Sequence, residues 1–385
     1  MIDKLIFWIS AGVIFYVYAG YPFVLWLMQF LFRRPVRKEP ITPSVSLLVA
    51  AYNEADVIEA KIRNAFALDY PPEQLEIVVA SDGSTDKTVS IVRSLIPQEG
   101  QGRVRLLEFS ENRGKLAILN DSVPQLGGDI VVFSDATSML AKDSLKHLIS
   151  NFADPRVGAV SGVYRVVNKG RANLGAQEDL YWKYETFLKM HEARIGGLTG
   201  AHGSLYAIRK TLYPFPAVGT INDDFVIPTS VLRQGFRIAY ETKAVSYEEA
   251  EEMEGFGRRV RISAGNVEQL REAKALLWPP RPLALFCFLS HKGGRLLVPP
   301  ALIALLVSSA LLWRLPLYRW MLWGQIAFYA LALVGAFRGL KPKVLRLPFY
   351  YCWISAAWFV WLYQVMLRRK REASSGGGRR PVEWS

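Results

Sequence analysis

The sequence predicts an α/β domain with a mostly parallel sheet, flanked at both ends of the chain by apolar helices. Two observations lead to this prediction. Between residues 44 and 150, short apolar runs alternate with segments of helical spacing, which is the pattern of βαβ units. Long stretches without a charged residue lie at 5–32 and beyond 296, and about 20 apolar residues suffice to cross a bilayer.

Composition and charge agree with a membrane-associated protein. The 385 residues are 51% hydrophobic and carry a formal net charge of +13. Lys and Arg cluster at the edges of the apolar stretches, which favours contact with anionic lipid over nucleic acid. No zinc-finger, helix-turn-helix or RNA-recognition pattern is present. Cys287 and Cys352 lie in apolar surroundings outside any CxxC pattern, so we expect neither a disulfide framework nor a cysteine metal site.

The first element is a predicted membrane helix from Leu5 to Phe32, within an N-terminal segment 1–33. It is too long for the apolar part of a signal peptide and lacks a small-residue cleavage site. Basic residues follow it directly: Arg33, Arg34, Arg37 and Lys38. They predict that this end faces the cytoplasm. A proline-rich linker up to residue 43 then leads into the α/β domain, predicted over 44–275.

Four apolar runs of this domain predict parallel strands, with helices between them. The strands are expected at 45–50, 75–80, 104–107 and 130–133, and the helices at 56–68, 88–95 and 115–123. Three of the strands end in polar loops that carry Asn53 and Glu54, Asp82, and Asp135. Ligands bind at the C-terminal ends of such strands, and a carboxylate there can hold a divalent metal and, through it, a diphosphate.

The second half of the domain is less regular. We expect helices at 144–152 and 180–192, one or two strands within 157–167, and strands at 205–208 and 238–240. A glycine-rich loop at 196–204 contains Gly200 and His202 and allows close approach of a ligand or another chain segment. Asp223 and Asp224 stand before a predicted helix at 225–233.

The C-terminal region predicts further membrane contact. Residues 276–295 are aromatic but interrupted by prolines, so we expect an interfacial amphipathic segment. Three spans are expected within 296–367, at 296–313, 320–337 and 347–367, followed by a basic disordered tail at 368–385. Three spans after a cytoplasmic domain would place the tail outside, whereas its arginines favour the inside. The side of the C-terminus therefore stays open.

Six short motifs together resemble a known family. They are Val-Ala-Ala-Tyr-Asn-Glu at 49–54, Ser-Asp-Gly-Ser-Thr-Asp at 81–86, Asn-Arg-Gly-Lys at 112–115, Ser-Asp-Ala at 134–136, Asn-Asp-Asp at 222–224 and Arg-Arg-Val-Arg-Ile at 258–262. In order and spacing, residues 44–265 resemble the family 2 glycosyltransferases of the GT-A fold. Their membrane-integrated branch is the most similar and includes synthases of cellulose, hyaluronan and poly-N-acetylglucosamine.

The resemblance implies a role for each matching residue. The donor would be a nucleotide sugar, expected to be UDP-linked, with Mg²⁺ or Mn²⁺ bound by Asp135. Asp224 would be the catalytic base, and Gly200, His202 and Asp223 would lie on the acceptor side. The residues expected to bind the donor are Ala51, Tyr52, Asn53, Glu54, Asp82, Lys115, Ser134, Asp135, Arg258 and Arg261.

Several of these residues also have an ordinary structural interpretation. Asp82 and Glu54 could cap turns, Lys115 could be a solvated loop lysine, and Asp224 could cap its helix. His202 is favoured as a hydrogen-bonded structural residue, and Arg258 could belong to a basic helix at the membrane surface.

Three positions depart from the family motifs. Arg258 stands where a glutamine is usual. Thr137 stands where a second acid is usual, so we expect the metal to bind weakly without donor. Ile262 stands where a tryptophan usually supports the growing chain, which weakens the argument for processive synthesis.

The sequence therefore predicts an inverting glycosyltransferase in the inner membrane, multi-pass, with a cytoplasmic catalytic domain. Its acceptor would be a glycan or a lipid-linked sugar, as in polysaccharide or exopolysaccharide synthesis. Its other partners would be membrane lipids and not nucleic acid, and oligomerisation is left open. One alternative is the addition of a single sugar to a polyprenyl-linked acceptor, and another is a non-catalytic membrane scaffold. A channel or transporter is disfavoured because the spans carry no internal charge.

Overall fold

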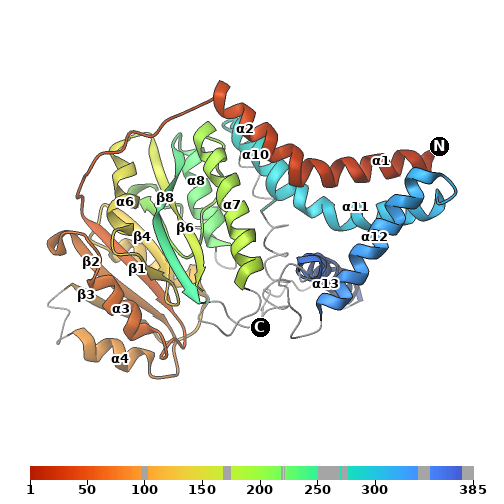
Figure 1. The fold of residues 1–385 in the computed structure, drawn as a ribbon. Helices are drawn as coiled ribbons and strands as arrows, with labels where there is room; N and C mark the ends of the chain where they lie inside the picture. Colours follow the sequence, from red (N-terminus) through yellow and green to blue (C-terminus); the bar gives the residue numbers. More distant parts are fainter. Residues whose placement is uncertain are drawn as a thin grey trace.

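A computed structural model contains an eight-stranded sheet in the order β3-β2-β1-β4-β7-β6-β8-β5 (Figure 1). The strands are β1 (Val45–Ala51), β2 (Leu75–Asp82), β3 (Val104–Phe109), β4 (Ile130–Asp135), β5 (Met139–Leu140), β6 (Val157–Val167), β7 (Tyr206–Arg209) and β8 (Arg237–Glu249). The structure describes residues 1–96, 103–167, 175–217, 220, 222–249, 265, 269–270, 276–336 and 347–374.

The direction of the strands decides where the site lies. β1 pairs in parallel with β2 and β4, and β2 with β3. β7 is antiparallel to both β4 and β6, which turns β6, and with it β8, back to the direction of β4. The C-terminal ends of β1, β2, β4 and β8 therefore share one edge. The predicted mostly parallel α/β sheet is confirmed, with β5 and β7 as antiparallel members.

Helices cover both faces of the sheet because alternate residues of each strand point to opposite sides. Val45, Leu47 and Val49 pack in one core cluster, whereas Leu48 packs in another. The first cluster includes residues of α3 (Ile58–Phe66), α4 (Thr88–Leu95) and α6 (Ser144–Ser150). The second includes residues of α5 (Lys115–Ser122) and α8 (Asp223–Arg233), and α7 (Gly175–Ile195) packs against it.

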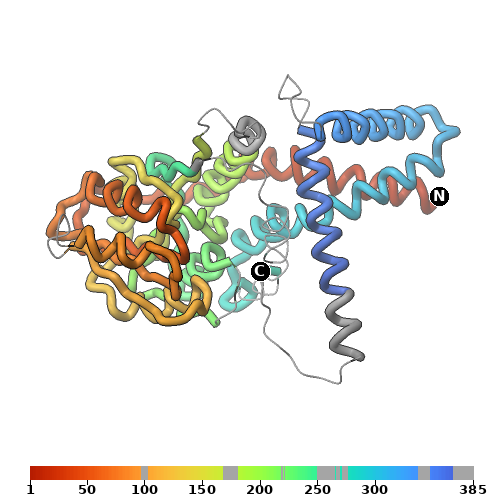
Figure 2. The backbone as a smooth tube through the Cα atoms, turned by 90° about the horizontal axis from the view of Figure 1, so that it is seen from below, coloured from red at the N-terminus to blue at the C-terminus, as the bar shows by residue number. Residues whose placement is uncertain are grey.

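Two long helices extend from this domain. The first runs through α1 (Ile2–Phe15), the π-helical turn Tyr16–Gly20 and α2 (Tyr21–Leu31). The second runs through α10 (Pro282–Phe288), the π-helical turn Leu289–Gly293 and α11 (Gly294–Leu311). They lie side by side, and α12 (Pro316–Gly335) and α13 (Leu347–Ser374) follow (Figures 1 and 2). By length and composition, Ile2–Leu31 and Pro282–Leu311 could each cross a membrane; no other helix among the described residues meets both criteria.

The C-terminal boundaries differ from those predicted. We expected an interfacial segment up to residue 295 and a span from 296, but one helix continues from Pro282 to Leu311. The prolines that suggested a broken segment precede this helix or occupy its first turn, where a missing N–H is tolerated. Helix α13 also continues to Ser374, seven residues into the tail predicted to be disordered. β8 is longer than the predicted strand at 238–240 and ends at Glu249.

Candidate active site

Lys115 brings two of the predicted carboxylates together at the C-terminal edge of the sheet. It is the first residue of α5, and its Nζ lies 2.9 Å from Asp135 Oδ1 and 3.3 Å from Asp223 Oδ2. Burial opposes the charge on this ammonium, but the carboxylates of Asp135 and Asp223 raise its pKa. The Tyr206 hydroxyl donates to Asp223 Oδ2 at 3.0 Å. Residues of β4, α5, α8 and β7 thus converge on one polar site.

The loop that carries Lys115 is held by Asp82. The Asp82 carboxylate accepts hydrogen bonds from the backbone N–H of Arg113 and Gly114, both at 2.8 Å. Gly114 has φ +86°, a conformation that favours glycine. Asp82 therefore positions the start of α5, and its contact with a nucleotide stays a prediction.

The loop after β1 lies against the loop after β2. Asn53 adopts φ +55°, and its Oδ1 accepts from the N–H of Thr85 at 2.8 Å and of Asp86 at 3.3 Å. The N–H of Glu54 donates to Thr88 Oγ1 at 2.8 Å. Ala51 is buried opposite Ser81, whereas Tyr52 is exposed at the rim. The predicted nucleotide residues of these loops are thus adjacent, at the same edge as Asp135.

Asp135 and Asp224 approach each other across Gly203. A Cβ at position 203 would lie 3.8 Å from Asp135 Oδ2 and 3.7 Å from Asp224 Oδ2. Burial, with a further contribution from Asp223, raises the pKa of Asp224 to about 6, while Lys189, Lys115 and Lys292 oppose the shift. Asn222 occupies the N-cap position of α8, and no side-chain bond caps this helix. A carboxylate with a raised pKa beside a residue without a side chain suits proton abstraction.

The glycine-rich loop packs behind Asp224. Gly200, at φ +73°, donates its N–H to Thr229 Oγ1 at 3.1 Å, and the N–H of Ala201 donates to the Asp224 carbonyl at 2.7 Å. His202 is buried, and its Nε2 lies 3.0 Å from the Tyr240 hydroxyl. Burial lowers the pKa of His202 well below its usual range, so the imidazole is neutral. These contacts agree with a structural role for His202.

Two charged residues near Asp135 were missed from the sequence. Lys61 of α3 is fully buried; its Nζ donates to Ser134 Oγ at 2.7 Å and to the Ser138 carbonyl. Burial lowers its pKa to about 7, against the carboxylates of Asp135 and Glu248. Glu248, near the end of β8, accepts a hydrogen bond from Thr137 Oγ1 at 2.7 Å. The position that lacks the usual acid is thus bonded to a carboxylate from another strand.

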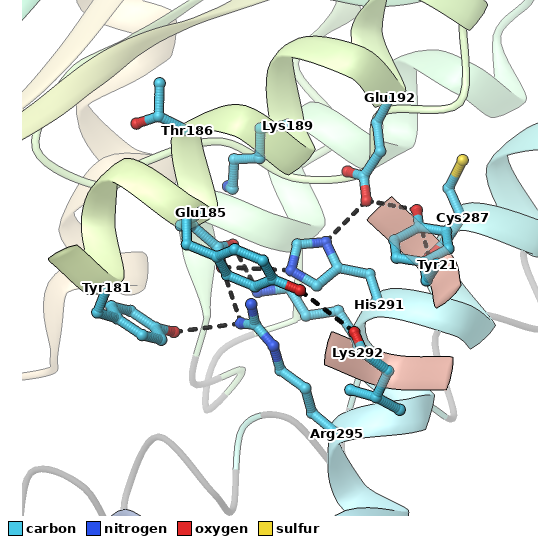
Figure 3. Close-up of polar contacts among 12 residues, drawn as sticks. Tyr21, Tyr181, Glu185, Thr186, Lys189, Glu192, Cys287, His291, Lys292 and Arg295 are labelled. Atoms are coloured by element: carbon cyan, nitrogen blue, oxygen red, sulfur yellow. Dashed lines mark hydrogen bonds and ion pairs between the residues drawn. The ribbon is translucent and has the colours of Figure 1, made fainter. Parts of the chain in front are cut away.

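A buried cluster of charges joins α7 to the two long helices (Figure 3). Glu185 Oε2 lies 2.8 Å from Arg295 Nη1 and 3.2 Å from His291 Nε2. Glu192 Oε1 lies 2.7 Å from the hydroxyl of Tyr21 and 2.7 Å from His291 Nδ1. Because Lys292 contributes to the potential at Asp224, this junction is electrostatically connected to the candidate base.

The residues at Asp135 suit a divalent cation with oxygen ligands. Asp135 offers a carboxylate, and Thr137 and Glu248 add a hydroxyl and a second carboxylate at the same edge. Gly203 places no side chain between Asp135 and Asp224. No group of three or more His, Cys, Asp and Glu side chains suited to a metal occurs among the described residues. Donor oxygens would thus have to complete the coordination. Arg258 and Arg261, predicted to contact the donor, lie outside the described residues.

A family model described as glycosyltransferase like family 2 matches residues 43–264, more than half of the chain. The chain belongs to this family. The match confirms the resemblance inferred from the six motifs and covers the residues around Asp135 and Asp224, but not Tyr21, His291 or Arg295 of the charge cluster.

Relatives of this family 2 glycosyltransferase include enzymes with different products. It is 28% identical over 271 residues to a poly-beta-1,6-N-acetyl-D-glucosamine synthase of Staphylococcus aureus, covering 69% of this chain and 63% of that protein. It is 31% identical over 175 residues to a beta-monoglucosyldiacylglycerol synthase of Nostoc, covering 44% of this chain and 36% of that one. The chain therefore spans less than two thirds of the length of either relative.

One solved structure resembles the chain over almost its whole length. It is a mannosyltransferase from Pyrobaculum calidifontis in complex with GDP-Man and Mn²⁺, 26% identical, with a TM-score of 0.69. The match covers 92% of this chain and 99% of that one. The predicted GT-A fold, including its association with flanking helices, is thereby confirmed.

Proposed function

We propose that this protein transfers a sugar from a nucleoside-diphosphate sugar to a glycan or lipid-linked acceptor at the membrane surface, with inversion at the anomeric carbon. The observation that carries the proposal is the pair of carboxylates, Asp135 and Asp224, on either side of Gly203. One would lie by the donor diphosphate and the other by the acceptor hydroxyl. Family membership and the synthase relatives support this assignment.

In the proposed reaction, the acceptor oxygen attacks the anomeric carbon as the bond from that carbon to the phosphate oxygen breaks. The Asp224 carboxylate takes the proton of the acceptor hydroxyl, and the nucleoside diphosphate leaves with the bonding electron pair. The Lys115 ammonium, raised in pKa by two carboxylates, stays charged and stabilises the negative charge of the leaving group. A divalent cation held by Asp135, with Glu248 and Thr137 beside it, would neutralise the same charge.

The nucleobase of the donor and the identity of the cation are two separate questions. The motifs favour a UDP-sugar, whereas the mannosyltransferase neighbour holds GDP-Man and Mn²⁺. We expect the nucleobase of the donor to bind at exposed Tyr52 and at the loops that carry Asn53 and Asp82. We infer a cytoplasmic catalytic domain because Arg33 and Arg34 follow the first candidate span.

A single transfer to a lipid-linked acceptor is the second candidate. The chain matches the mannosyltransferase over 99% of that protein but only 63% of the poly-beta-1,6-N-acetyl-D-glucosamine synthase. The acceptor platform expected at position 262 is also absent. The missing platform favours a short product over a long polymer.

To test this proposal, the purified protein is reconstituted in membranes and incubated with a panel of radiolabelled UDP- and GDP-sugars. Each donor is tried with Mn²⁺, with Mg²⁺ and with a chelator. We expect one donor to be consumed, with loss of turnover in chelator. Sizing of the product then separates one addition from many. Failure to consume any nucleotide sugar in the presence of membrane lipid extract would support the scaffold alternative.

A further inference from the structure

A cavity of about 270 Å³ lies at the end of β8 opposite to the candidate active site. Four arginines line it: Arg34, Arg156, Arg237 and Arg281. The cavity also meets Gly235, beyond the C-terminal end of α8, whereas Asp224 lies at the other end of that helix. The 11 residues of α8 span about 16 Å, so this cavity is separate from the transfer site.

The charge around this cavity is not balanced. Asp154, which pairs with two of these arginines, is already engaged: Arg156 donates to it through Nε and Nη2, both at 3.0 Å, and Arg237 donates through Nη2. Arg237 Nη1 also donates to the Arg34 carbonyl at 3.0 Å. Among the described residues, the guanidinium groups of Arg34 and Arg281 have no carboxylate partner, and Arg281 Nε is buried without a hydrogen bond. This leaves an excess of positive charge and free donors.

Glycines make room for these side chains. A Cβ at Gly196 would lie 3.1 Å from Arg34 Cδ, and a Cβ at Gly235 would lie 3.9 Å from Arg281 Nη2. Both glycines have positive φ, +74° and +94°. The backbone at Gly196 therefore lies close to the Arg34 side chain, and both glycines adopt a conformation that side-chain-bearing residues disfavour.

The cavity lies where both candidate membrane helices join the catalytic domain. Arg34 follows the helix that ends at Leu31, and Arg281 directly precedes the helix that begins at Pro282 (Figure 1). Trp278, 83% exposed, and Leu277, 56% exposed, stand just before Arg281. Exposed tryptophan beside basic residues is typical of the level of lipid headgroups in a bilayer.

We propose that this cavity binds the phosphate group of an anionic membrane lipid. Guanidinium groups bind phosphate oxygens through paired, charge-assisted hydrogen bonds, and Arg34 and Arg281 keep donors available for them. The position between two candidate spans favours a lipid headgroup over free phosphate. The bound lipid would fix the catalytic domain against the bilayer, independently of donor or acceptor.

The test is the thermal unfolding of the detergent-solubilised full-length protein with three probes: dioctanoyl phosphatidic acid, dioctanoyl phosphatidylcholine and inorganic phosphate. We expect phosphatidic acid to raise the Tm at the lowest concentration. In R34Q/R281Q, the concentration needed for half of this shift should rise at least about tenfold, since two charge-assisted hydrogen-bond donors are lost. R33Q is the control, because it removes an arginine charge from the position next to Arg34 but outside the cavity.

Each other outcome overturns the proposal in a different way. An equal loss in R33Q and R34Q/R281Q would mean general attraction to a basic surface and no defined site. Equal potency of inorganic phosphate and phosphatidic acid would assign the cavity to a free phosphate. If R34Q/R281Q does not fold, R34K/R281K replaces it: lysine keeps the charge but not the paired geometry, so an unchanged lipid response would also reject the site.

Discussion

The two ends of β8 hold charged residues in opposite ways. At its first residue, Arg237 pairs with Asp154, whose side chain is 1% exposed and also accepts from Arg156 and from the N–H of Arg37. Hydrogen bonds from Arg156, together with those of Arg37 and Arg237, hold the pKa of Asp154 well below its usual range. Near the other end, Glu248 accepts from Thr137 alone among the described residues, and Lys61 has no carboxylate within ion-pair distance there.

At the first end the paired charges stabilise the fold, whereas at the other end the charged groups have few partners and are available to bind a ligand. A buried carboxylate that accepts several hydrogen bonds stabilises the fold. Removing one member of such a pair leaves the other charge buried without a partner, which costs much stability. A buried charge with free hydrogen-bonding capacity costs stability unless something else binds it. The 13 residues of β8 span about 40 Å, so the two ends should respond independently to mutation.

The largest effect is expected from D224N, at the catalytic end. Asparagine keeps the size of the side chain but cannot take the acceptor proton, so turnover should fall by about 10²–10⁴-fold. The donor KM should change little, because Asp135 and Lys115 remain. Initial rates with the donor identified by the panel measure both constants. The exposed D143N is the control, and wild-type turnover by D224N would remove Asp224 from the mechanism.

The next effect belongs to the other end of the strand. D154N should lower the free energy of unfolding by about 3 kcal/mol, because it leaves Arg237 without its buried partner. R156Q is the matched control: its side chain is 70% exposed, so a loss below about 1 kcal/mol is expected. Denaturant unfolding in detergent gives both values. Specific activity of the folded D154N protein should stay near that of wild type, and a parallel loss would show that the two ends are coupled.

The sequence predicted the strands and loops of the catalytic end well. Apolar runs followed by Asn53, Asp82 and Asp135 are local patterns, and βαβ connectivity places such loops at one edge. The approach of Asp135 to Asp224 across Gly203 could not be predicted, because it depends on β7 entering the sheet antiparallel between β4 and β6.

Glu248 and Lys61 show why the rest was missed. Glu248 reaches Thr137 only through the pairing of Met139 with Tyr247, a two-residue strand without any sequence signal. A lysine on a helix ordinarily faces the solvent, but Lys61 of α3 is fully buried. Pro279, Pro280 and Pro282 suggested a broken segment, although prolines also precede and begin helices. Each of these features depends on strand register or burial in the folded protein, which local sequence patterns do not reveal.

A smaller effect is expected from E248Q, which tests whether the second carboxylate serves the cation. In the presence of nucleoside diphosphate, Mn²⁺ should bind about tenfold more weakly, as is common when a residue supporting a metal is lost. The electron paramagnetic resonance signal of free Mn²⁺ measures this directly, without turnover. E59Q, in an exposed ion pair on α3, is the control. Unchanged Mn²⁺ affinity would leave Asp135 and the donor as the metal site.

The smallest effect links the reaction to stability. Because burial raises the pKa of Asp224 from 3.8 to about 6, the folded state binds this proton more tightly than the unfolded state does. The buried ionised carboxylate lowers the free energy of unfolding. This loss of stability is absent below pH 3.8, grows as the pH rises from 3.8 to about 6, and is complete above about 6. D224N should therefore be more stable than wild type at neutral pH and equal to it near pH 4.

Wild-type kcat/KM should show the opposite trend with pH, falling about tenfold per unit below about 6 as the base is protonated. Unfolding curves and rate profiles over one pH series test both trends. D224N that is less stable than wild type at every pH would make Asp224 a structural acid like Asp154. The contrast between the two ends of β8 would then fail, because a base that costs stability in its active form distinguishes the catalytic end.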